Sequence, residues 1–175
     1  AIVGNRVYVE GWSKDGHNHL WCLDAGSGQV IWKQSFSEKE ADGKGGPRGT
    51  PCVDGERIYT FSQHGKLHCR ALRDGKDLWQ TTIDVGKPGW SLSGSPVVSG
   101  EVVLVHAGDG GFGVNAKTGA VLWKSDGKAG YATPVVDRRG GRPAMVLKTQ
   151  GGAMGREADT GKVLWVYSAL GSDIE

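Results

Sequence analysis

Short runs of alternating apolar and polar residues follow one another along the whole chain, and none has the 3.6-residue spacing of an amphipathic helix. Three of these runs open with a Ser-Pro or Thr-Pro step, at residues 50–51, 95–96 and 133–134. A proline at the first position of a strand does least harm to the hydrogen-bond ladder, and apolar or β-branched residues follow it each time. The pattern predicts short β-strands that begin at these steps.

A second landmark closes each repeat, namely a glycine four residues before a tryptophan. The four pairs are Gly28 with Trp32, Gly75 with Trp79, Gly119 with Trp123, and Gly161 with Trp165. Glycine adopts the positive φ of a tight turn without steric cost, so each pair predicts a hairpin whose second strand carries the tryptophan. The tryptophans recur at intervals of 47, 44 and 42 residues, which is typical of a four-stranded propeller blade.

We therefore predict an all-β fold, a β-propeller of four-stranded antiparallel blades. One domain is expected over residues 1–175, with blades at about 1–46, 47–92, 93–130 and 131–175. Because the last strand of a repeat is apolar on both sides, as at residues 121–123, each sheet is expected to be covered on both faces. The four tryptophans are expected to be structural and largely buried.

The chain begins one residue after the place where a Ser-Pro step would fall, and it ends about where the next step is due. We expect four consecutive blades of a longer propeller, with a complete four-bladed ring or a different closure as the alternatives. Four blades of a larger ring would leave two uncovered apolar faces, which favour association. The side chains expected there are Val30, Ile31 and Trp32 at one end, and Val163, Leu164 and Trp165 at the other.

Composition agrees with many tight turns, because the chain has 30 glycines without a collagen period. The 21 basic and 19 acidic residues nearly balance, and no basic stripe indicates nucleic-acid binding. No apolar run approaches the roughly 18 residues of a transmembrane helix, and no segment has the features of a signal peptide.

Residues with catalytic or metal-binding potential have structural explanations. Cys22, Cys52 and Cys69 are not adjacent and are odd in number, so they predict no disulfide framework. The histidines near the hairpins, His17, His19, His64 and His68, lack a Cys or carboxylate at metal-ligand spacing on the same face. Aspartates fall at turns, where carboxylates cap backbone amides: Asp24, Asp54, Asp74, Asp137 and Asp159. We expect no catalytic residue and no metal site.

The best place for a ligand or partner is the connection from the last strand of one blade to the first strand of the next, because loops on a rigid scaffold usually carry function. Arg48, Trp90 and Tyr131 stand a few residues before the prolines in these connections, near the expected axial mouth. The two aromatic residues could anchor a partner or stack on a planar ligand. The alternative is that they only cover the ends of neighbouring blades.

The stretch "GREADTGKVLW" at 155–165 and its three counterparts resemble the tryptophan-docking repeat of the pyrroloquinoline-quinone-type β-propellers. The resemblance covers essentially the whole chain and implies a ring of usually eight blades. In that family the tryptophan packs between blades against the glycine turn and against a small residue ten positions earlier. Those small residues are Cys22, Cys69, Gly113 and Gly155 here.

The family contains two functional classes, so the resemblance alone does not decide the function. One is the non-enzymatic propeller of outer-membrane barrel assembly, which implies an extracytoplasmic scaffold that binds a protein partner and needs no cofactor. The other is the quinoprotein dehydrogenase, which uses pyrroloquinoline quinone with calcium and often a pair of adjacent cysteines. Such catalysis needs a metal held by oxygen ligands, a carboxylate base and a flat enclosure for the quinone, and of these parts the sequence offers only a candidate stacking residue, Trp90. We therefore favour the scaffold. A dehydrogenase with its catalytic blades outside this segment is the alternative, and carbohydrate or small-ligand binding at the axial mouth is a third reading.

Overall fold

The computed structural model describes residues 1–37, 46–84, 92–107, 110–125, 131–139, 141–149 and 151–168. These residues form strands and turns without a helix, and the strands group into four separate four-stranded antiparallel sheets. In each sheet the strands lie side by side in chain order, because every strand pairs with the next one along the sequence. The all-β prediction is confirmed.

The four sheets are called blades 1 to 4. Blade 1 comprises β1 (Ile2–Val3), β2 (Arg6–Ser13), β3 (His17–Asp24) and β4 (Val30–Ser37). Blade 2 comprises β5 (Cys52–Asp54), β6 (Arg57–Phe61), β7 (Lys66–Ala71) and β8 (Asp77–Thr82). Blade 3 comprises β9 (Val97–Ser99), β10 (Val102–Val105), β11 (Phe112–Asn115) and β12 (Val121–Lys124). Blade 4 comprises β13 (Val135–Asp137), β14 (Ala144–Thr149), β15 (Gly152–Glu157) and β16 (Val163–Tyr167).

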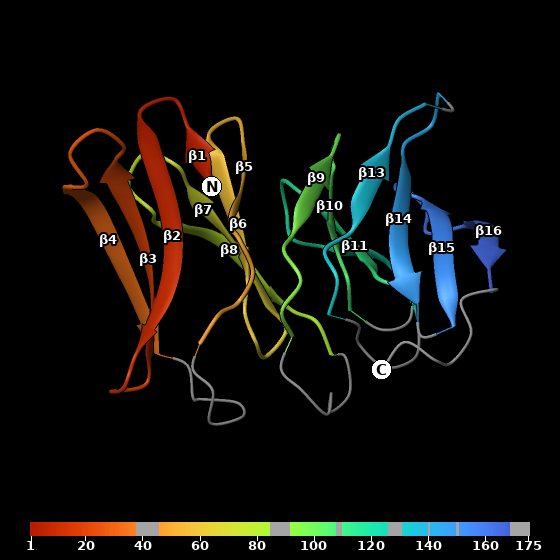
Figure 1. The fold of residues 1–175 in the computed structure, drawn as a ribbon, viewed down its shortest axis with the longest axis horizontal. Helices are drawn as coiled ribbons and strands as arrows, with labels where there is room; N and C mark the ends of the chain where they lie inside the picture. The colour runs from red at the N-terminus through yellow and green to blue at the C-terminus, as the bar shows by residue number, and fades with distance from the viewer. Residues whose placement is uncertain are drawn as a thin grey trace.

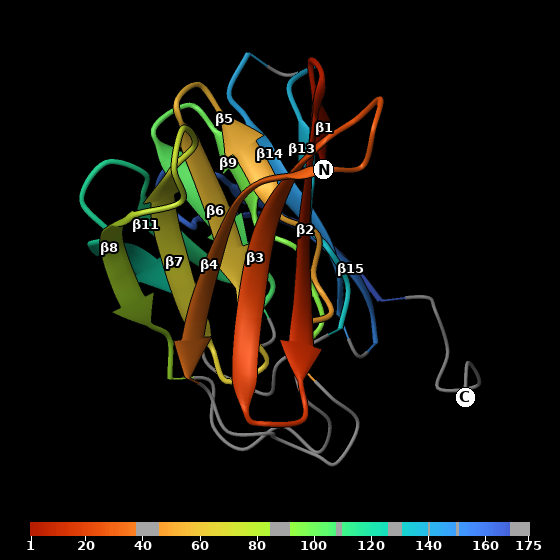
Figure 2. The same ribbon diagram turned by 90° about the vertical axis from the view of Figure 1, so that its left-hand side faces the viewer.

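The blades follow one another as an arc, with blade 1 and blade 4 at its two ends (Figure 1). The short first strands β1, β5, β9 and β13 lie toward the inside of the arc, and the fourth strands lie toward its outside. Turning the molecule by 90° brings β2, β3 and β4 to the front, with the other blades behind them (Figure 2). One broad face of blade 1 therefore has no described residues in front of it.

The hairpin between the third and fourth strands is built in the same way in every blade. Gly28, Gly75, Gly119 and Gly161 have φ values of 71°, 71°, 77° and 71°, as the Gly-to-Trp spacing predicts. At the start of the turn, a side-chain oxygen of Asp24 or Asn115 accepts hydrogen bonds from two backbone amides. These bonds cap the turns of blades 1 and 3, whereas in blade 2 Ala71 stands at this position and Asp74 accepts a hydrogen bond from the Lys76 amide instead.

The apolar cores lie between neighbouring blades. Tyr8, Leu20 and Cys22 of blade 1 form one core with Ile58 of blade 2. A larger core joins blades 2 and 3, and a third core joins blades 3 and 4 around Trp123 and Met145. Because alternate residues of a strand point to opposite faces, an inner blade contributes to a core on each side.

The fourth strands depart from the expectation that both faces are covered. Only the tryptophan side packs into a core, and the residues before it are exposed: Val30, Ile31, Leu78, Val121, Leu122, Val163 and Leu164. The reason is position, because these strands form the outer edge of each sheet and have no strand beyond them. One or two exposed apolar residues before each tryptophan thus mark the outer rim of the arc.

Candidate functional site

The tryptophans join each blade to the glycine turn of the next one. A Cβ placed on Gly75 would lie 2.6 Å from the Trp32 ring, and the corresponding distances are 2.7 Å for Gly119 with Trp79 and 2.5 Å for Gly161 with Trp123. Only glycine allows so close an approach. The predicted structural role of the tryptophans is thus seen at three successive joints.

The indole N–H groups add a hydrogen bond to two of these joints. Trp79 Nε1 donates to the carbonyl oxygen of Ala116 at 3.1 Å, and Trp123 Nε1 donates to that of Ala158 at 2.8 Å. The small residues implied by the family resemblance, Cys22, Cys69, Gly113 and Gly155, stand directly opposite the tryptophans of their own blades. Each tryptophan is therefore paired with a small residue on the neighbouring strand of its own blade, which leaves room for the ring.

Two expectations about the tryptophans are wrong. Trp165 is 43% exposed rather than buried, because among the described residues no glycine turn follows blade 4 to cover it. Trp32 does not lie on an uncovered end face, because it packs on the Gly75 turn of blade 2. Val9 and Trp21 are paired on β2 and β3 and alternate with Tyr8, Leu20 and Cys22, so they lie on the face of blade 1 away from blade 2, where the Lys33 ammonium is 5.2 Å from the Trp21 ring.

The Ser-Pro and Thr-Pro steps connect the blades near the axis. The Thr50 amide donates to Ser95 Oγ at 2.8 Å, and the Ser95 amide donates to Thr133 Oγ1 at 3.0 Å. The hydroxyl residue before each proline thus continues a hydrogen-bonded chain from blade 2 to blade 4. The hydroxyl residue recurs in all three steps of the sequence, and this recurrence is the signal for the contact between blades.

The chain enters β5, β9 and β13 from the same side, at the lower end of each blade in Figure 1. Arg48 and Tyr131 hold the equivalent position in two of these segments, two residues before the hydroxyl residue, and both are exposed. Ser93 has this position in the third segment, and its Oγ donates to the Tyr131 carbonyl oxygen at 3.2 Å. The structure therefore places Arg48 and Tyr131 at the lower end of the blades, which we call the entry end. Trp90 lies outside the described residues.

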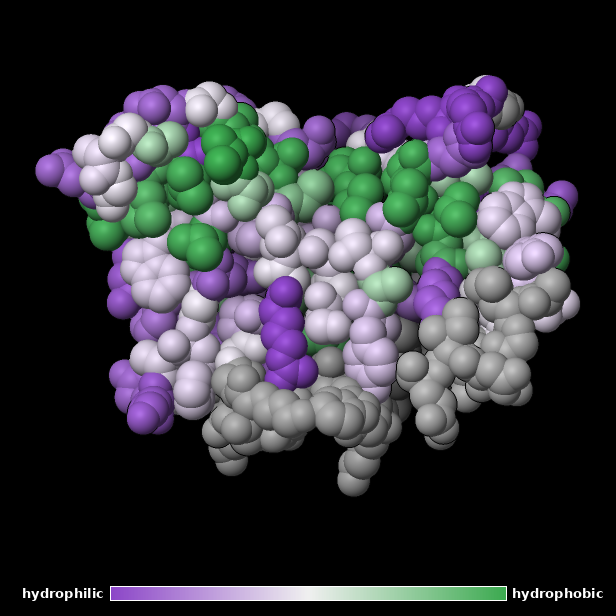
Figure 3. Space-filling view, in the orientation of Figure 1, coloured by the Kyte–Doolittle hydropathy of each residue, from purple (hydrophilic) through white to green (hydrophobic). Residues whose placement is uncertain are grey.

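The inner strands present apolar side chains above this end. Ile2 is 72% exposed and Val135 is 64% exposed, and Val3 is exposed beside them. In the space-filling view a band of hydrophobic residues crosses the upper part of this face, with paler and more polar residues below it (Figure 3). The candidate binding surface thus combines an apolar inner wall with an aromatic and a basic side chain at its entry end.

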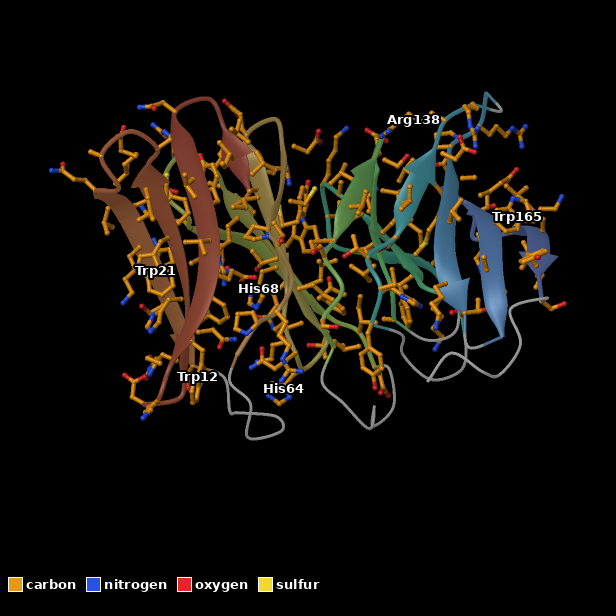
Figure 4. The ribbon with its side chains drawn as sticks, viewed as in Figure 1. Trp12, Trp21, His64, His68, Arg138 and Trp165 are labelled. Carbon is orange, nitrogen blue, oxygen red and sulfur yellow. The ribbon has the colours of Figure 1, made fainter. Side chains whose placement is uncertain are left out.

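A buried polar cluster between blades 1 and 2 was not predicted. Arg70 is only 2% exposed, and its Nε lies 2.9 Å from Asp77 Oδ1 while its guanidinium covers the Phe36 ring at 4.4 Å. His68 Nδ1 lies 3.1 Å from the same guanidinium. Figure 4 shows His68 in the middle of the blade and His64 at its lower end. The alternation of His68 with Arg70 on one face of a strand is the signal that could have found this cluster.

His19 and His64 take part in hydrogen bonds with serine hydroxyl groups at a strand pair and at a turn. Both ring nitrogens of His19 meet a serine hydroxyl, Ser13 at 2.7 Å and Ser35 at 2.8 Å. The His64 amide donates to Ser62 Oγ at the β6–β7 turn. Among the described residues no three His, Cys, Asp or Glu side chains are grouped closely enough to hold a metal ion.

The described residues do not fit pyrroloquinoline quinone with calcium. The three cysteines are free thiols on different strands, so no pair of adjacent cysteines can cover a quinone. Three of the turn aspartates are already engaged, because Asp24 and Asp74 cap turns and Asp137 pairs with Arg139. Hydrogen bonds from the Ser27 backbone and side chain hold the pKa of Asp24 below its usual value, as expected for a capping carboxylate.

Comparison with known proteins identifies the family. A family model described as "Outer membrane protein assembly factor BamB" matches residues 16–173. The chain belongs to the BamB family. BamB of Yersinia pestis is 29% identical in an alignment of 156 residues that covers 82% of this chain and 37% of that protein. Quinohemoprotein alcohol dehydrogenase ADH IIB of Pseudomonas putida is 30% identical in an alignment of 123 residues that covers 59% of this chain and 16% of that protein.

Solved structures confirm the β-propeller fold. The crystal structure of BamB from Moraxella catarrhalis matches with a TM-score of 0.67 at 20% identity, over 94% of this chain and 46% of that chain. Quinohemoprotein alcohol dehydrogenase from Comamonas testosteroni matches with a TM-score of 0.70 at 16% identity, over 95% of this chain and 34% of its own length. The BamB-family chain thus spans less than half the length of the relatives that it matches.

Membership of the BamB family also bears on location. A family of outer-membrane assembly factors works outside the cytoplasm, so the predicted extracytoplasmic location is confirmed. No helix among the described residues is long and apolar enough to span a membrane.

Proposed function

We propose that this BamB-family chain is a non-catalytic binding module in outer-membrane protein assembly, and that it engages a protein partner at the entry end of its blades. The observation that carries the proposal is the placement of Arg48 and Tyr131 at equivalent, exposed positions in the segments that lead into β5 and β13, at the lower end of the blades in Figure 1. Tyrosine and arginine are enriched among the residues that dominate protein interfaces.

The scaffold beneath these residues supports the same function. The segments that carry Arg48 and Tyr131 continue directly into the hydrogen-bonded chain of Thr50, Ser95 and Thr133. A fixed backbone lowers the entropy lost when a side chain is immobilised by a partner. The entry end therefore presents its side chains from a rigid support.

Substitution of Tyr131 by alanine should weaken binding to a partner about 10-fold, corresponding to the loss of roughly 1.4 kcal/mol at an aromatic contact. The measurement is the dissociation constant, obtained by surface plasmon resonance, for the chain and purified outer-membrane protein assembly machinery that lacks its own BamB. The matched control is Leu78→Ala on the outer rim, because Leu78 is 50% exposed and Tyr131 is 49% exposed. Equal affinities for the Tyr131 and Leu78 variants would contradict binding at the entry end.

The quinohemoprotein relative supports the dehydrogenase alternative, which predicts that the chain binds the quinone cofactor. The non-catalytic function predicts that it does not. Titration with pyrroloquinoline quinone in the presence of Ca²⁺, followed by absorbance, should show no saturable site, because calcium needs several oxygen ligands and the quinone needs a flat enclosure. Trp90→Ala should leave the titration unchanged. Calcium-dependent micromolar binding that this variant abolishes would favour the dehydrogenase.

A further inference from the structure

The three joints at which a tryptophan packs on the glycine turn of the following blade are not built alike. In the joint between blades 2 and 3, the carbonyl oxygen of Ala116 accepts hydrogen bonds from three side chains of blade 2, namely Trp79 at 3.1 Å, Tyr59 at 3.2 Å and Arg57 at 3.3 Å. These bonds fix the turn of blade 3 against blade 2.

The joint between blades 1 and 2 lacks the central bond of this arrangement. Leu72 stands at the position of Ala116, because each lies three residues before its turn glycine and donates its amide to the first hairpin of its own blade. Trp32 has the place of Trp79, but its indole N–H is buried and has no hydrogen-bond partner among the described residues. The tryptophan therefore does not tie blade 1 to the backbone of blade 2.

A pocket of about 530 Å³ lies at this joint, whereas the pocket at the same place between blades 2 and 3 has about 280 Å³. Both lie at the upper end of the blades in Figure 1, opposite the entry end, where the first hairpin of one blade meets the turn before the fourth strand of the next. Because the smaller pocket has a blade of this chain on each side, a pocket at this place is a property of the joint. The larger volume falls within the range of roughly 300–1,000 Å³ that is usual for small-molecule sites.

The wall of the larger pocket is mostly apolar. Val3, Tyr8 and Ile31 of blade 1 face Leu72 of blade 2 across it. Tyr8 also belongs to the core that joins the two blades, and Leu72 packs against that core. The pocket therefore lies on the side of blade 1 that faces blade 2.

The polar groups of this pocket leave one cation available. Arg6 is exposed at the pocket and forms no salt bridge among the described residues. Asp24 is already engaged, because its Oδ1 accepts hydrogen bonds from two turn amides and its Oδ2 accepts one from Asn5 Nδ2 at 2.6 Å. Burial raises the pKa of Tyr8, against the opposing effect of Arg6, so the Tyr8 hydroxyl stays protonated and uncharged.

We propose that this pocket binds a small apolar carboxylate. Its apolar part packs against Val3, Ile31 and Leu72, and its carboxylate accepts hydrogen bonds from the Arg6 guanidinium. Bonds between a guanidinium and a carboxylate are charge-assisted and can be bidentate, so they fix the orientation of a ligand whose remaining contacts are apolar. The site lies at the opposite end of the blades from Arg48 and Tyr131, so it does not depend on the proposed partner binding.

The test is an NMR titration of the ¹⁵N-labelled 175-residue chain with phenylacetate, a small aromatic carboxylate. Amide signals of the residues that line the pocket should shift in a saturable way, with a dissociation constant of about 1 mM for a probe of this size. Arg6→Gln should weaken the binding of phenylacetate about 10-fold and leave the binding of the neutral analogue 2-phenylacetamide nearly unchanged. Ile31→Asp should weaken the binding of both probes, because it removes part of the apolar wall.

Arg73→Gln and Leu78→Asp are the matched controls. Arg73 is an exposed arginine next to Leu72 but outside the pocket, and Leu78 holds the place of Ile31 in blade 2 with 50% exposure against 45%. Both variants should bind phenylacetate like the wild type. Arg6 and Ile31 are exposed, so their variants should keep the wild-type circular dichroism spectrum. Unsaturable shifts, shifts centred away from the pocket, or equal effects of the Arg6 and Arg73 variants would overturn the proposal.

Discussion

Replacing Trp123 by alanine should lower the free energy of unfolding by about 3–5 kcal/mol, the usual range for removing a buried aromatic side chain. Trp123 is 9% exposed and packs on the Gly161 turn, and its Nε1 donates to the Ala158 carbonyl oxygen at 2.8 Å. The substitution removes the ring from the core between blades 3 and 4, and it also leaves that carbonyl without its partner. Urea unfolding followed by circular dichroism gives the measurement.

The chain provides its own control in Trp165, which has the same place in the repeat but is 43% exposed. Trp165→Ala should cost about 1 kcal/mol or less at chain concentrations too low for association, because less apolar area is lost from the interior. The contrast between the two variants isolates the contribution of the following blade. If they destabilised the chain equally, the tryptophans would be stabilised by their own sheets, and the joint would contribute little.

The fold could be predicted from the sequence because its determinants are local and repeated. A positive φ at Gly28, Gly75, Gly119 and Gly161 follows from the residue type, and the strand after the turn follows from its apolar residues. The tryptophan interval then fixes the size of the repeat. None of these inferences depends on knowing which residues of different blades meet.

Contacts between blades were less predictable, because they depend on which side of a blade its tryptophan faces. The sequence pattern identifies Trp32 and Trp165 as equivalent, but it does not say that each tryptophan looks toward the following blade. Trp32 was therefore assigned to an open face, although it packs on Gly75, and Trp165 was expected to be buried. The direction of the blade sequence around the axis supplies the missing information.

The candidate site was predictable only in its position along the chain. The connections that carry Arg48 and Tyr131 could be located from the prolines that follow them. Their alignment at the entry end of the blades depends on hydrogen bonds between blades, from Thr50 to Ser95 and from Ser95 to Thr133. Buried Arg70 was missed for a similar reason, since its partner Asp77 lies on the next strand and Phe36 lies on another blade.

The stability of the chain should fall as the pH is lowered from about 7 to about 5, and His68 should account for about 2 kcal/mol of the loss. Burial between the blades lowers the pKa of His68 from 6.5 to about 4, and the Arg70 guanidinium acts in the same direction against the opposing effect of Asp77. Lys66 on the same strand also lowers the pKa of His68 slightly. The His68 side chain is only 5% exposed, so solvent screens these effects little.

The sign follows from which state binds the proton. Between pH 6.5 and about 4 the unfolded chain holds a protonated His68 whereas the folded chain holds a neutral one, so lowering the pH favours unfolding throughout this window. Above pH 6.5 both states are neutral at His68, and its contribution no longer changes. Urea unfolding at a series of pH values should therefore show the steepest loss below pH 6.5.

His68→Phe separates this effect from the other titrating groups, because Phe112 holds the equivalent position in blade 3 and shows that the fold accepts an aromatic side chain there. The variant should lose about 2 kcal/mol less than the wild type between about pH 7 and about pH 5. His17→Asn is the control for the loss of a histidine, since the His17 side chain is 43% exposed and lies outside the buried cluster. His19 remains in both variants, and burial lowers its pKa as well, so a residual slope is expected. Wild-type pH dependence in the His68→Phe variant would show that the buried cluster does not couple folding to protonation.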